Sequence, residues 1–483
     1  MINFKLIGKI IGSLLFIEAA FMTVCLALAL FYREDDVFGF LVAIITTLLA
    51  AFVLRYYGRN ASNLLNRRDA YLVVTLSWVM FSLFGTLPFT VSGFVTNFTD
   101  AYFENMSGFT TTGASVIDDV EALPHGLLFW RSLTQWVGGL GIMFFTIALL
   151  PSLVGGSVKV FSAEATGPLK TKMHPRLSTN AKWIWMVYII ITVLCVACLC
   201  LAGMDLFNSI NYAMSVAATG GFATQNTSAM NRPAVEYVIM FFCFVSGINF
   251  TVLYITAVKK KLGHLLKNEE FKFYALLVIL FTAFIMVELV WRNNYGIEKA
   301  FRCAAFQVIS FITTTGLVND DAGQWPHVTW VVLAVCMFFG ACSGSTSGGI
   351  KCVRGVMLTK VIANEFKQIL HPNAVLPLRV DKTNVSMQKR VTLLAFLSIY
   401  LVLCLFCSFV MIAEGVDNTN AITITLSSMG NVGPTLGLEI GPTMSWSILS
   451  PLAKWICTLL MLIGRLEIFT VLVIFTPAFW KSN

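Results

Sequence analysis

Four short polar strips interrupt apolar sequence, and each contains a glycine at an equivalent position. They read Thr-Thr-Thr-Gly-Ala, Thr-Gly-Gly-Phe-Ala, Thr-Thr-Thr-Gly-Leu and Gly-Asn-Val-Gly-Pro, at residues 110–114, 219–223, 313–317 and 430–434. The equivalent glycines, separated by 108, 95 and 117 residues, are Gly113, Gly221, Gly316 and Gly433. Strips rich in accessible backbone offer carbonyl oxygens, which can replace the hydration shell of a cation. Four such strips, each flanked by apolar segments, predict a four-fold ion selectivity filter.

The composition places these strips in a membrane protein. Hydrophobic residues make up 57% of the chain, charged residues only 12%, and the mean hydropathy is +0.79. Such values indicate a polytopic membrane protein without a sizeable soluble domain. The first apolar segment lacks a small-residue cleavage site, so we expect a retained span rather than a removed signal peptide. The net charge of +8 is explained by membrane topology and gives no support to nucleic-acid binding.

Cysteine and histidine do not predict a transition-metal site. The pairs Cys195/Cys198 and Cys404/Cys407 have C-x-x-C spacing, but both lie within apolar runs without nearby histidines. Cysteines of that kind usually behave as small packing residues. The five histidines are scattered along the chain. We therefore expect no covalent cofactor.

Segments of about 20 apolar residues are long enough to span a bilayer. By this criterion the sequence predicts ten spans, near 8–32, 37–57, 70–93, 125–150, 183–204, 234–258, 271–291, 328–363, 391–413 and 451–476. The eighth of these spans is interrupted at 340–349 by glycine and serine. Such an interruption frees backbone groups that need new hydrogen-bond partners or water. A packing kink between helices is the alternative to a functional loop at this position.

Shorter segments precede each strip, at 98–109, 205–218, 297–312 and 417–429. Thr99-Asp100, Asp205 and Asp417-Asn418 are plausible helix starts. We interpret each segment as a half-helix that enters the membrane part way, followed by its strip. The predicted fold is thus an all-α polytopic membrane protein, with two N-terminal spans and four span–pore-helix–filter–span repeats around a central pore.

The repeats set the expected domain boundaries. They give an N-terminal two-span region at 1–68 and repeats at 69–158, 159–268, 269–389 and 390–483, with the interrupted span in the third repeat. Basic residues cluster in alternate loops, which predicts a cytoplasmic face that also holds both termini. Acidic residues near the strips, such as Asp118 and Asp320, predict an acidic mouth, although a solvated loop surface explains each one equally well. We expect Arg131 and Lys351 at the membrane interfaces.

The chain resembles the Trk/Ktr/HKT superfamily of potassium transport proteins, and within it the bacterial TrkH/TrkG-type membrane subunits. The resemblance covers essentially the whole chain. Its motifs stand at residues 107–114, 220–222, 344–346, 371–375, 431–434 and 464–467. Together and in this order they are specific, although each one alone is weak.

The resemblance implies a pore with one filter glycine from each repeat. The K⁺ filter residues that it implies are Thr111, Thr112, Gly113, Gly220, Gly221, Thr314, Thr315, Gly316, Asn431, Val432 and Gly433. It also implies a gate below the filter, made by the loop 340–349 and by a charged residue of the last pore-lining span. The gate residues are Gly344, Ser345, Thr346, Gly348, Gly349 and Arg465. A structural ion pair with Glu467 is the alternative role for Arg465.

Further expectations follow from the resemblance. Plant relatives with serine at the first filter glycine prefer sodium, so Gly113 favours potassium. Family members form homodimers in the bacterial inner membrane and bind a cytosolic ring of nucleotide-binding regulatory subunits of the TrkA type. Any dependence on ATP or NAD would therefore reside in that partner, and membrane lipid would surround the spans.

The leading hypothesis is channel-like K⁺ uptake by a protein that is not an enzyme. The alternative within transport is K⁺ symport coupled to H⁺ or Na⁺, although Glu467 is nearly alone as an acidic residue within the spans. A polytopic membrane enzyme is the remote alternative. A phosphate-binding loop at 344–351 is excluded, because Ile350 separates the glycine from Lys351.

Overall fold

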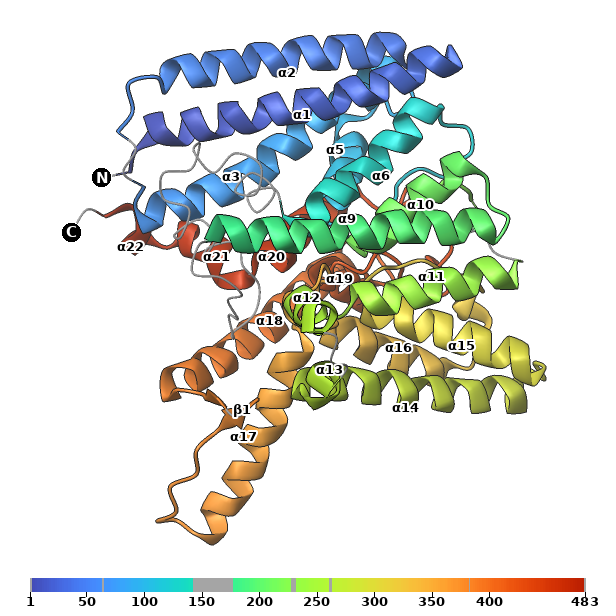
Figure 1. The fold of residues 1–483 in the computed structure, drawn as a ribbon, viewed down its shortest axis with the longest axis vertical. Coiled ribbons are helices and arrows are strands. Elements are labelled where there is room, and N and C mark those ends of the chain that lie inside the picture. Colours follow the sequence, from blue (N-terminus) through green and yellow to red (C-terminus); the bar gives the residue numbers. More distant parts are fainter. Residues whose placement is uncertain are drawn as a thin grey trace.

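The computed structural model describes residues 2–62, 65–141, 177–226, 232–259, 263–381 and 383–481. The described chain is almost entirely helical, and its long helices run roughly side by side (Figure 1). A short antiparallel hairpin, β1 (Arg379–Val380) with β2 (Thr383–Asn384), follows α17, which projects beyond the other helices (Figure 1). The predicted all-α polytopic fold is confirmed.

In the part of the chain that the structure describes, six helical segments are long and apolar enough to cross a membrane by themselves. They are α1 (Phe4–Tyr32), α2 (Val37–Tyr57), α3 (Arg67–Gly85) continued by α4 (Leu87–Ser92), α9 (Leu177–Leu201), α14 (Glu269–Arg292) and α18 (Met387–Ala413). Their outward faces carry exposed apolar side chains, for example Phe52 at 64% and Phe406 at 63%. Large apolar faces of this kind are compatible with lipid rather than with water.

Two of the predicted spans are bent pairs of helices, which the sequence reading missed. α11 (Pro233–Ser246) meets α12 (Phe250–Lys259) at 98°, and α20 (Pro451–Leu466) meets α21 (Ile468–Leu472) at 114°. Gly247 ends α11, and the Asn249 side chain accepts the backbone N–H of Thr251 to start α12. The second bend falls at Glu467, whose φ is +65°. The spans predicted at 234–258 and 451–476 are therefore present as bent helix pairs, and the sequence analysis did not predict the bends.

The interruption predicted near 340–349 is present. α16 (His327–Phe339) ends before it and α17 (Cys352–Leu370) begins after it, which leaves residues 340–351 without regular helix. We call residues 340–351 the intramembrane loop. The predicted span 125–150 is seen as α6 (His125–Leu140), and its remaining part lies outside the described residues, as does the predicted boundary at 158/159.

The four predicted half-helices are also present. They are α5 (Phe98–Phe109), α10 (Leu206–Ala218), α15 (Ile297–Ile312) and α19 (Asn418–Gly430). Asp205 and Asp417 cap α10 and α19 as expected, since their carboxylates accept backbone N–H groups of the first turn. In α5 the cap is Asn97 rather than Thr99 or Asp100, because Asn97 accepts the N–H of Thr99.

The two ends of the chain lie at the same end of the helix bundle. The Asn3 N–H donates to Asp69, and Arg68 donates to the carbonyls of Ala478 and Lys481, so both ends contact the start of α3. The remaining short elements are α13 (Gly263–Lys267), η2 (Ala322–Gln324), η3 (Val473–Phe475) and α22 (Pro477–Trp480). We refer to this end of the bundle as the terminus end, and to the opposite end, where the half-helices begin, as the mouth end.

Candidate ion pathway

The four strips share one backbone conformation. In each strip a non-glycine residue with positive φ precedes the equivalent glycine by two residues. These residues are Thr111 (55°), Thr219 (52°), Thr314 (55°) and Asn431 (54°), and the glycines are Gly113 (83°), Gly221 (85°), Gly316 (77°) and Gly433 (102°). Positive φ is uncommon for threonine, so its recurrence at the same position in four separate strips indicates a common structural role.

Each half-helix ends in the same hydrogen bond. The backbone N–H of the residue before the glycine donates to a serine carbonyl five residues earlier, at 2.8 or 2.9 Å in all four strips. The donor and acceptor pairs are Thr112 to Ser107, Gly220 to Ser215, Thr315 to Ser310 and Val432 to Ser427. This is the Schellman pattern of a helix C-terminus, with its left-handed residue supplied by threonine or asparagine. The C-terminal, negative ends of four helix dipoles therefore precede the strips directly.

The glycines bring the four strips together in a closed ring. A Cβ on Gly113 would collide with the carbonyl oxygen of Gly220, one on Gly221 with that of Thr315, one on Gly316 with that of Val432, and one on Gly433 with that of Thr112. Each collision is with the next strip in order, and the fourth returns to the first. We call this arrangement the strip ring. Glycine is required at these positions by both its positive φ and the closeness of the neighbouring carbonyl.

The structure therefore places all of the predicted filter residues in one ring. Thr111, Thr112, Gly220, Thr314, Thr315, Asn431, Val432 and Gly433 are buried, and the other glycines are half-buried. Side chains join the strips across repeats, since the Asn431 amide donates to the Thr112 hydroxyl at 3.0 Å. Gln135 of α6 also braces the second strip, because it donates to the Gly220 carbonyl at 2.7 Å and accepts the Phe222 N–H at 3.1 Å.

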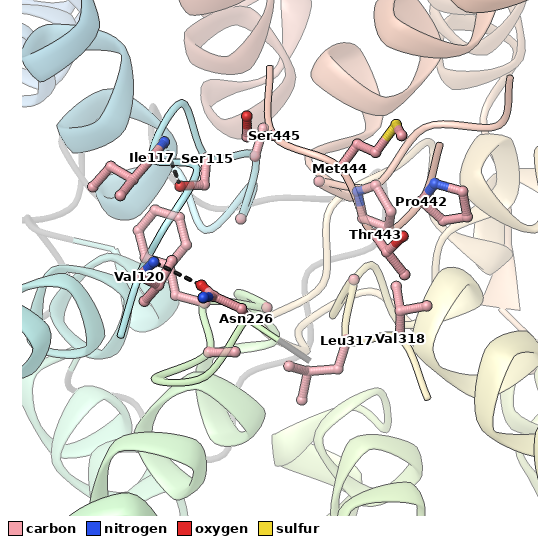
Figure 2. Close-up of a pocket in the computed structure, with 18 of the residues that line it drawn as sticks. Ser115, Ile117, Val120, Asn226, Leu317, Val318, Pro442, Thr443, Met444 and Ser445 are labelled. Carbon is pink, nitrogen blue, oxygen red and sulfur yellow. Dashed lines mark hydrogen bonds between the residues drawn. The ribbon is translucent and has the colours of Figure 1, made fainter. Parts of the chain in front are cut away.

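A cavity of about 460 Å³ lies on the mouth side of the strip ring. All four ring glycines line it, together with the loops that follow the strips and the segment 442–446. Figure 2 shows Ser115, Val120, Leu317 and Thr443 on different sides of this cavity. The loops of the first and second repeats are joined across it, since the Val120 N–H donates to Asn226 at 2.7 Å (Figure 2).

Three carboxylates line the cavity, namely Asp118, Asp320 and Asp321. Hydrogen bonds donated by the Ser445 and Ser447 hydroxyls hold the pKa of Asp118 below its ordinary value, so this side chain stays ionised at neutral pH. Negative charge at the entrance of a cavity concentrates cations there. Glu104, another acidic residue expected near the strips, does not line the cavity, because it is buried and paired.

Arg131 of α6, which we expected at a membrane interface, is buried within the protein as the partner of Glu104. The Arg131 side chain is only 3% exposed, and its Nε donates to Glu104 at 2.8 Å. The guanidinium also donates to the Ala223 carbonyl at 3.0 Å and lies 4.2 Å from the centre of the Phe222 ring. One side chain thus ties the first half-helix to the chain that leaves the second strip. An arginine six residues inside a predicted span was a signal that could have identified this role.

Replacing Arg131 by methionine is expected to destabilise the protein by about 3–5 kcal/mol, because it leaves the Glu104 carboxylate buried and unpaired. The double variant Glu104→Gln/Arg131→Met should recover part of this loss, since no buried charge then remains. Thermal unfolding of the purified variants in detergent measures both effects.

Arg292 provides the matched control for Arg131. Its 2.9 Å ion pair with Glu288 is at a helix end, and its side chain is 60% exposed, so Arg292→Met should change stability by less than about 1 kcal/mol. If Arg131→Met and Arg292→Met shifted the unfolding temperature equally, the Arg131 pair would have no special structural role.

The intramembrane loop lies directly against the terminus side of the strip ring. The Gly348 N–H donates to the Thr314 hydroxyl at 2.6 Å, and the Gly349 N–H donates to the Gly430 carbonyl at 2.9 Å. The Thr346 hydroxyl donates to the Ala217 carbonyl at 3.1 Å. The loop therefore contacts the second, third and fourth half-helix ends or strips.

Both ends of this loop are fastened by Glu270, near the start of α14. Its Oε1 accepts the N–H groups of Ser343 at 2.5 Å and Val353 at 3.1 Å, on opposite sides of the loop. Lys351, which we expected at an interface, is instead 2% exposed, and its ammonium donates to the Ser347 carbonyl. A single buried carboxylate thus holds the two arms of the loop together.

Arg465 connects the intramembrane loop to two helices. Its guanidinium donates to the Thr346 carbonyl at 2.7 Å and to the carbonyls of Gly138 and Gly139 at 2.7 and 2.5 Å. Arg465 lies in the last turn of α20, one residue before its end, rather than in the middle of a continuous span. Glu467 forms its ion pair with Arg354 of α17 at 2.6 Å. The predicted gate residues are therefore together, on the terminus side of the strip ring.

Comparison with known proteins supports one family for the whole chain. The chain matches the TrkH family of cation transport proteins over residues 38–482. It is 34% identical to the Trk system potassium uptake protein TrkH of Escherichia coli K12, over 99% of this chain and 100% of that protein. It is 32% identical to TrkG of the same strain, over 99% of both chains. The crystal structure of the potassium transporter TrkH from Vibrio parahaemolyticus superposes with a TM-score of 0.89 at 32% identity, over 99% of this chain and 100% of that one.

Proposed function

Because the chain belongs to the TrkH family of cation transport proteins, we propose that it conducts K⁺ into the cell through the strip ring. The observation that carries this proposal is the closed order of contacts, in which each ring glycine faces a carbonyl of the next strip. Backbone carbonyls of Thr112, Gly220, Thr315 and Val432 would replace the hydration shell of the ion. The relatives reported above are themselves named potassium uptake proteins.

Two features of the pathway favour a cation over an anion or a neutral solute, and a third favours potassium over sodium. The carboxylates Asp118, Asp320 and Asp321 line the cavity through which the ion enters. The four half-helices present their negative dipole ends to the strips. Gly113, rather than serine, stands at the first ring position, and this favours potassium over sodium in related proteins.

The intramembrane loop is the gate in this proposal. It crosses the path below the ring, where Thr346, Gly348 and Gly349 are within hydrogen-bonding distance of the half-helix ends and strips. Arg465 places a positive charge beside the loop, which opposes the passage of K⁺. Opening requires the loop to exchange its hydrogen bonds with Thr314 and Gly430 for other partners or for water.

The working assembly in this proposal is a homodimer in the bacterial inner membrane, with both termini in the cytoplasm. A cytosolic nucleotide-binding ring of the TrkA type would bind at the terminus end and supply any response to ATP or NAD. Adjacent residues of α14 support such a connection. Glu269 pairs with Lys360 of the projecting helix α17, whereas Glu270 holds the intramembrane loop. A partner that moves α17 would therefore act on the loop through α14.

Growth of a bacterial strain that lacks its own K⁺ uptake systems tests the proposed function. Expression of this chain, together with a regulatory partner of the TrkA type, should restore growth at limiting K⁺. The companion measurement is uptake of ⁸⁶Rb⁺ into the same cells. A chain that is present in the membrane but restores neither growth nor uptake would contradict the proposal.

A further inference from the structure

At the mouth end, three of the four seams between neighbouring repeats are bridged by a charged side chain, through an ion pair at two of them and through a hydrogen bond from Arg131 to a backbone carbonyl at the third. Arg131 joins Glu104 to the chain leaving the second strip. Glu236 of α11, which is 1% exposed, accepts Arg302 of α15 at 2.6 Å and Asn319 at 2.7 Å. Lys454 of α20 donates to Asp100 of α5 at 2.7 Å, which closes the seam between the fourth and first repeats. In each case the span that follows the strip of one repeat is therefore joined to the half-helix or the strip loop of the next repeat.

The fourth seam, between α16 and α19, is different. Among the described residues no ion pair joins the third and fourth repeats at the mouth end. In place of an ion pair the seam holds a cavity of about 560 Å³. This volume is within the range of about 300–1,000 Å³ that is usual for a small-molecule site. We call this space the α16–α19 slot.

The residues of the α16–α19 slot change from ionisable to apolar with depth. At the rim are His327, the first residue of α16, Asp417, the cap of α19, and Glu439. Val331 and Ala334 continue the His327 face of α16, four and seven residues on, so this wall runs about 10 Å along the helix. The opposite wall includes Leu436 and Leu438. His327 and Asp417 thus lie at helix starts and Glu439 lies in the loop after the fourth strip, whereas Val331 and Ala334 lie farther along α16.

The slot also opens toward the side of the bundle that faces the membrane. Val331 is 64% exposed and Leu438 is 76% exposed, although both line the slot. Val331 lies on the short apolar helix α16 and Leu438 lies in the loop after the fourth strip, and exposed apolar side chains of this size are compatible with lipid rather than with water. The inner wall is fixed, because the Trp330 indole donates to the Ala322 carbonyl at 2.7 Å and the Thr423 hydroxyl donates to the Leu436 carbonyl at 2.9 Å. A lipid chain can therefore enter from the side without unpacking the core.

The charges at the rim decide which lipid fits. Asp417 and Glu439 are carboxylates, and the residues that line the slot include no lysine or arginine. An anionic head group would be repelled there, whereas an ammonium would complete the charge balance. Within the described residues no group of His, Cys, Asp and Glu side chains has the arrangement of a metal site.

We propose that the α16–α19 slot binds a phospholipid with a primary ammonium head group, namely phosphatidylethanolamine. The ammonium lies between Asp417 and Glu439, and one acyl chain lies along Val331, Ala334 and Leu438. The lipid completes the seam at which, among the described residues, no charged side chain bridges the two repeats at the mouth end. Leu436 lies in the wall of the slot, three residues after Gly433 in the chain. The lipid therefore contacts the segment that supports this part of the strip ring.

Native mass spectrometry tests this proposal without any transport measurement. The full-length protein is reconstituted in vesicles of equal parts phosphatidylethanolamine and phosphatidylglycerol, extracted in mild detergent and analysed for the lipid it retains. We expect retained phosphatidylethanolamine to exceed phosphatidylglycerol, and the ratio to fall about fivefold in the Asp417→Asn/Glu439→Gln variant. Ala334→Phe, which fills the slot, should reduce retention of the bound lipid as well.

Asp205→Asn is the matched control, because Asp205 caps α10 as Asp417 caps α19 but does not line the slot. Asparagine also caps helices well, so both caps survive the substitution. Equal retention of the two lipids by the unmodified protein would overturn the proposal. An unchanged ratio in the Asp417→Asn/Glu439→Gln variant, or the same fall in Asp205→Asn, would also overturn it.

Discussion

Replacing Gly113 by serine is expected to abolish K⁺-limited growth and to lower K⁺ uptake about tenfold or more. The residue has a φ of +83°, which costs about 1–2 kcal/mol for a residue with a side chain. The new Cβ would also collide with the Gly220 carbonyl, a member of the strip ring. That carbonyl must move, and its displacement disturbs the coordination of the ion as well as the fold. Gly316→Ser should act in the same way through the Val432 carbonyl.

Gly93→Ser separates the two causes of this effect. Gly93 has the same φ of +83°, but a Cβ there would meet no atom within 4 Å. The control variant therefore carries the backbone strain without a collision, and it should keep most of the K⁺ uptake. The ratio of Na⁺ to ⁸⁶Rb⁺ uptake is the second readout, and it should rise only in the ring variants. Full growth and an unchanged ratio with Gly113→Ser would show that the strip ring does not select the ion.

Replacing Arg465 by alanine is expected to open the pathway in the absence of a regulatory partner. The substitution removes three hydrogen bonds, to Thr346, Gly138 and Gly139, and it removes a positive charge beside the intramembrane loop. At an effective dielectric constant of about 20, a unit charge several ångströms from the ion changes its energy by about 2 kcal/mol, which corresponds to about a thirtyfold change in flux. Flux of ⁸⁶Rb⁺ into vesicles that contain only this chain measures the effect.

Two further variants distinguish the charge of Arg465 from its hydrogen bonds. Arg465→Gln keeps a donor but removes the charge, so a leak in this variant indicates an electrostatic role. Arg68→Ala is the matched control, because Arg68 also donates to carbonyls, those of Ala478 and Lys481, but far along the chain from the loop. If vesicles that contain only the Arg465→Ala protein show no ⁸⁶Rb⁺ flux, and flux still requires the partner, then Arg465 is not part of the gate.

Local sequence was sufficient to predict the elements that form the strip ring. The half-helices and strips depend on short-range features, namely a capping residue, a dozen half-apolar residues and a strip ending in glycine. Because the half-helix and strip recur four times, the fourth strip could be identified although it lacks the threonine run. Asn431 and Val432 were placed by their position before Gly433 in the fourth repeat. The order of the contacts between strips could not be predicted, because it depends on how four distant segments pack.

Long-range polar contacts account for features that the sequence analysis did not predict. Arg131 and Lys351 were expected at membrane interfaces, and the structure shows both buried in the protein with polar partners. Glu104 lies 27 residues from Arg131, a pairing that no local pattern indicates. The bend at Gly247 was missed for a related reason. It depends on a close approach to the Thr313 side chain in another repeat.

The comparisons also decide between the two classes of functional hypothesis, namely a transport protein and a membrane enzyme. The chain belongs to a family of transport proteins, so the expectation that it is not an enzyme is confirmed. Coupling of K⁺ to H⁺ or Na⁺ stays an alternative within transport. Glu467 is not nearly alone as an acidic residue of the spans, because Glu18 of α1, Glu236 of α11 and Glu270 of α14 are also buried. Glu236 pairs with Arg302, and Glu270 accepts backbone N–H groups of the intramembrane loop and α17. However, α1 packs against α2, α3 and α6 rather than against the strips.

The location of bound ions tests the central claim most directly. Crystals of the protein grown with Rb⁺ or Tl⁺ in place of K⁺ reveal these ions by their anomalous scattering. The account predicts an anomalous peak inside the strip ring, between the carbonyls of Thr112, Gly220, Thr315 and Val432, and loss of this peak in Gly113→Ser. An empty ring in a protein that transports ⁸⁶Rb⁺, or ions bound only at other positions, would contradict it.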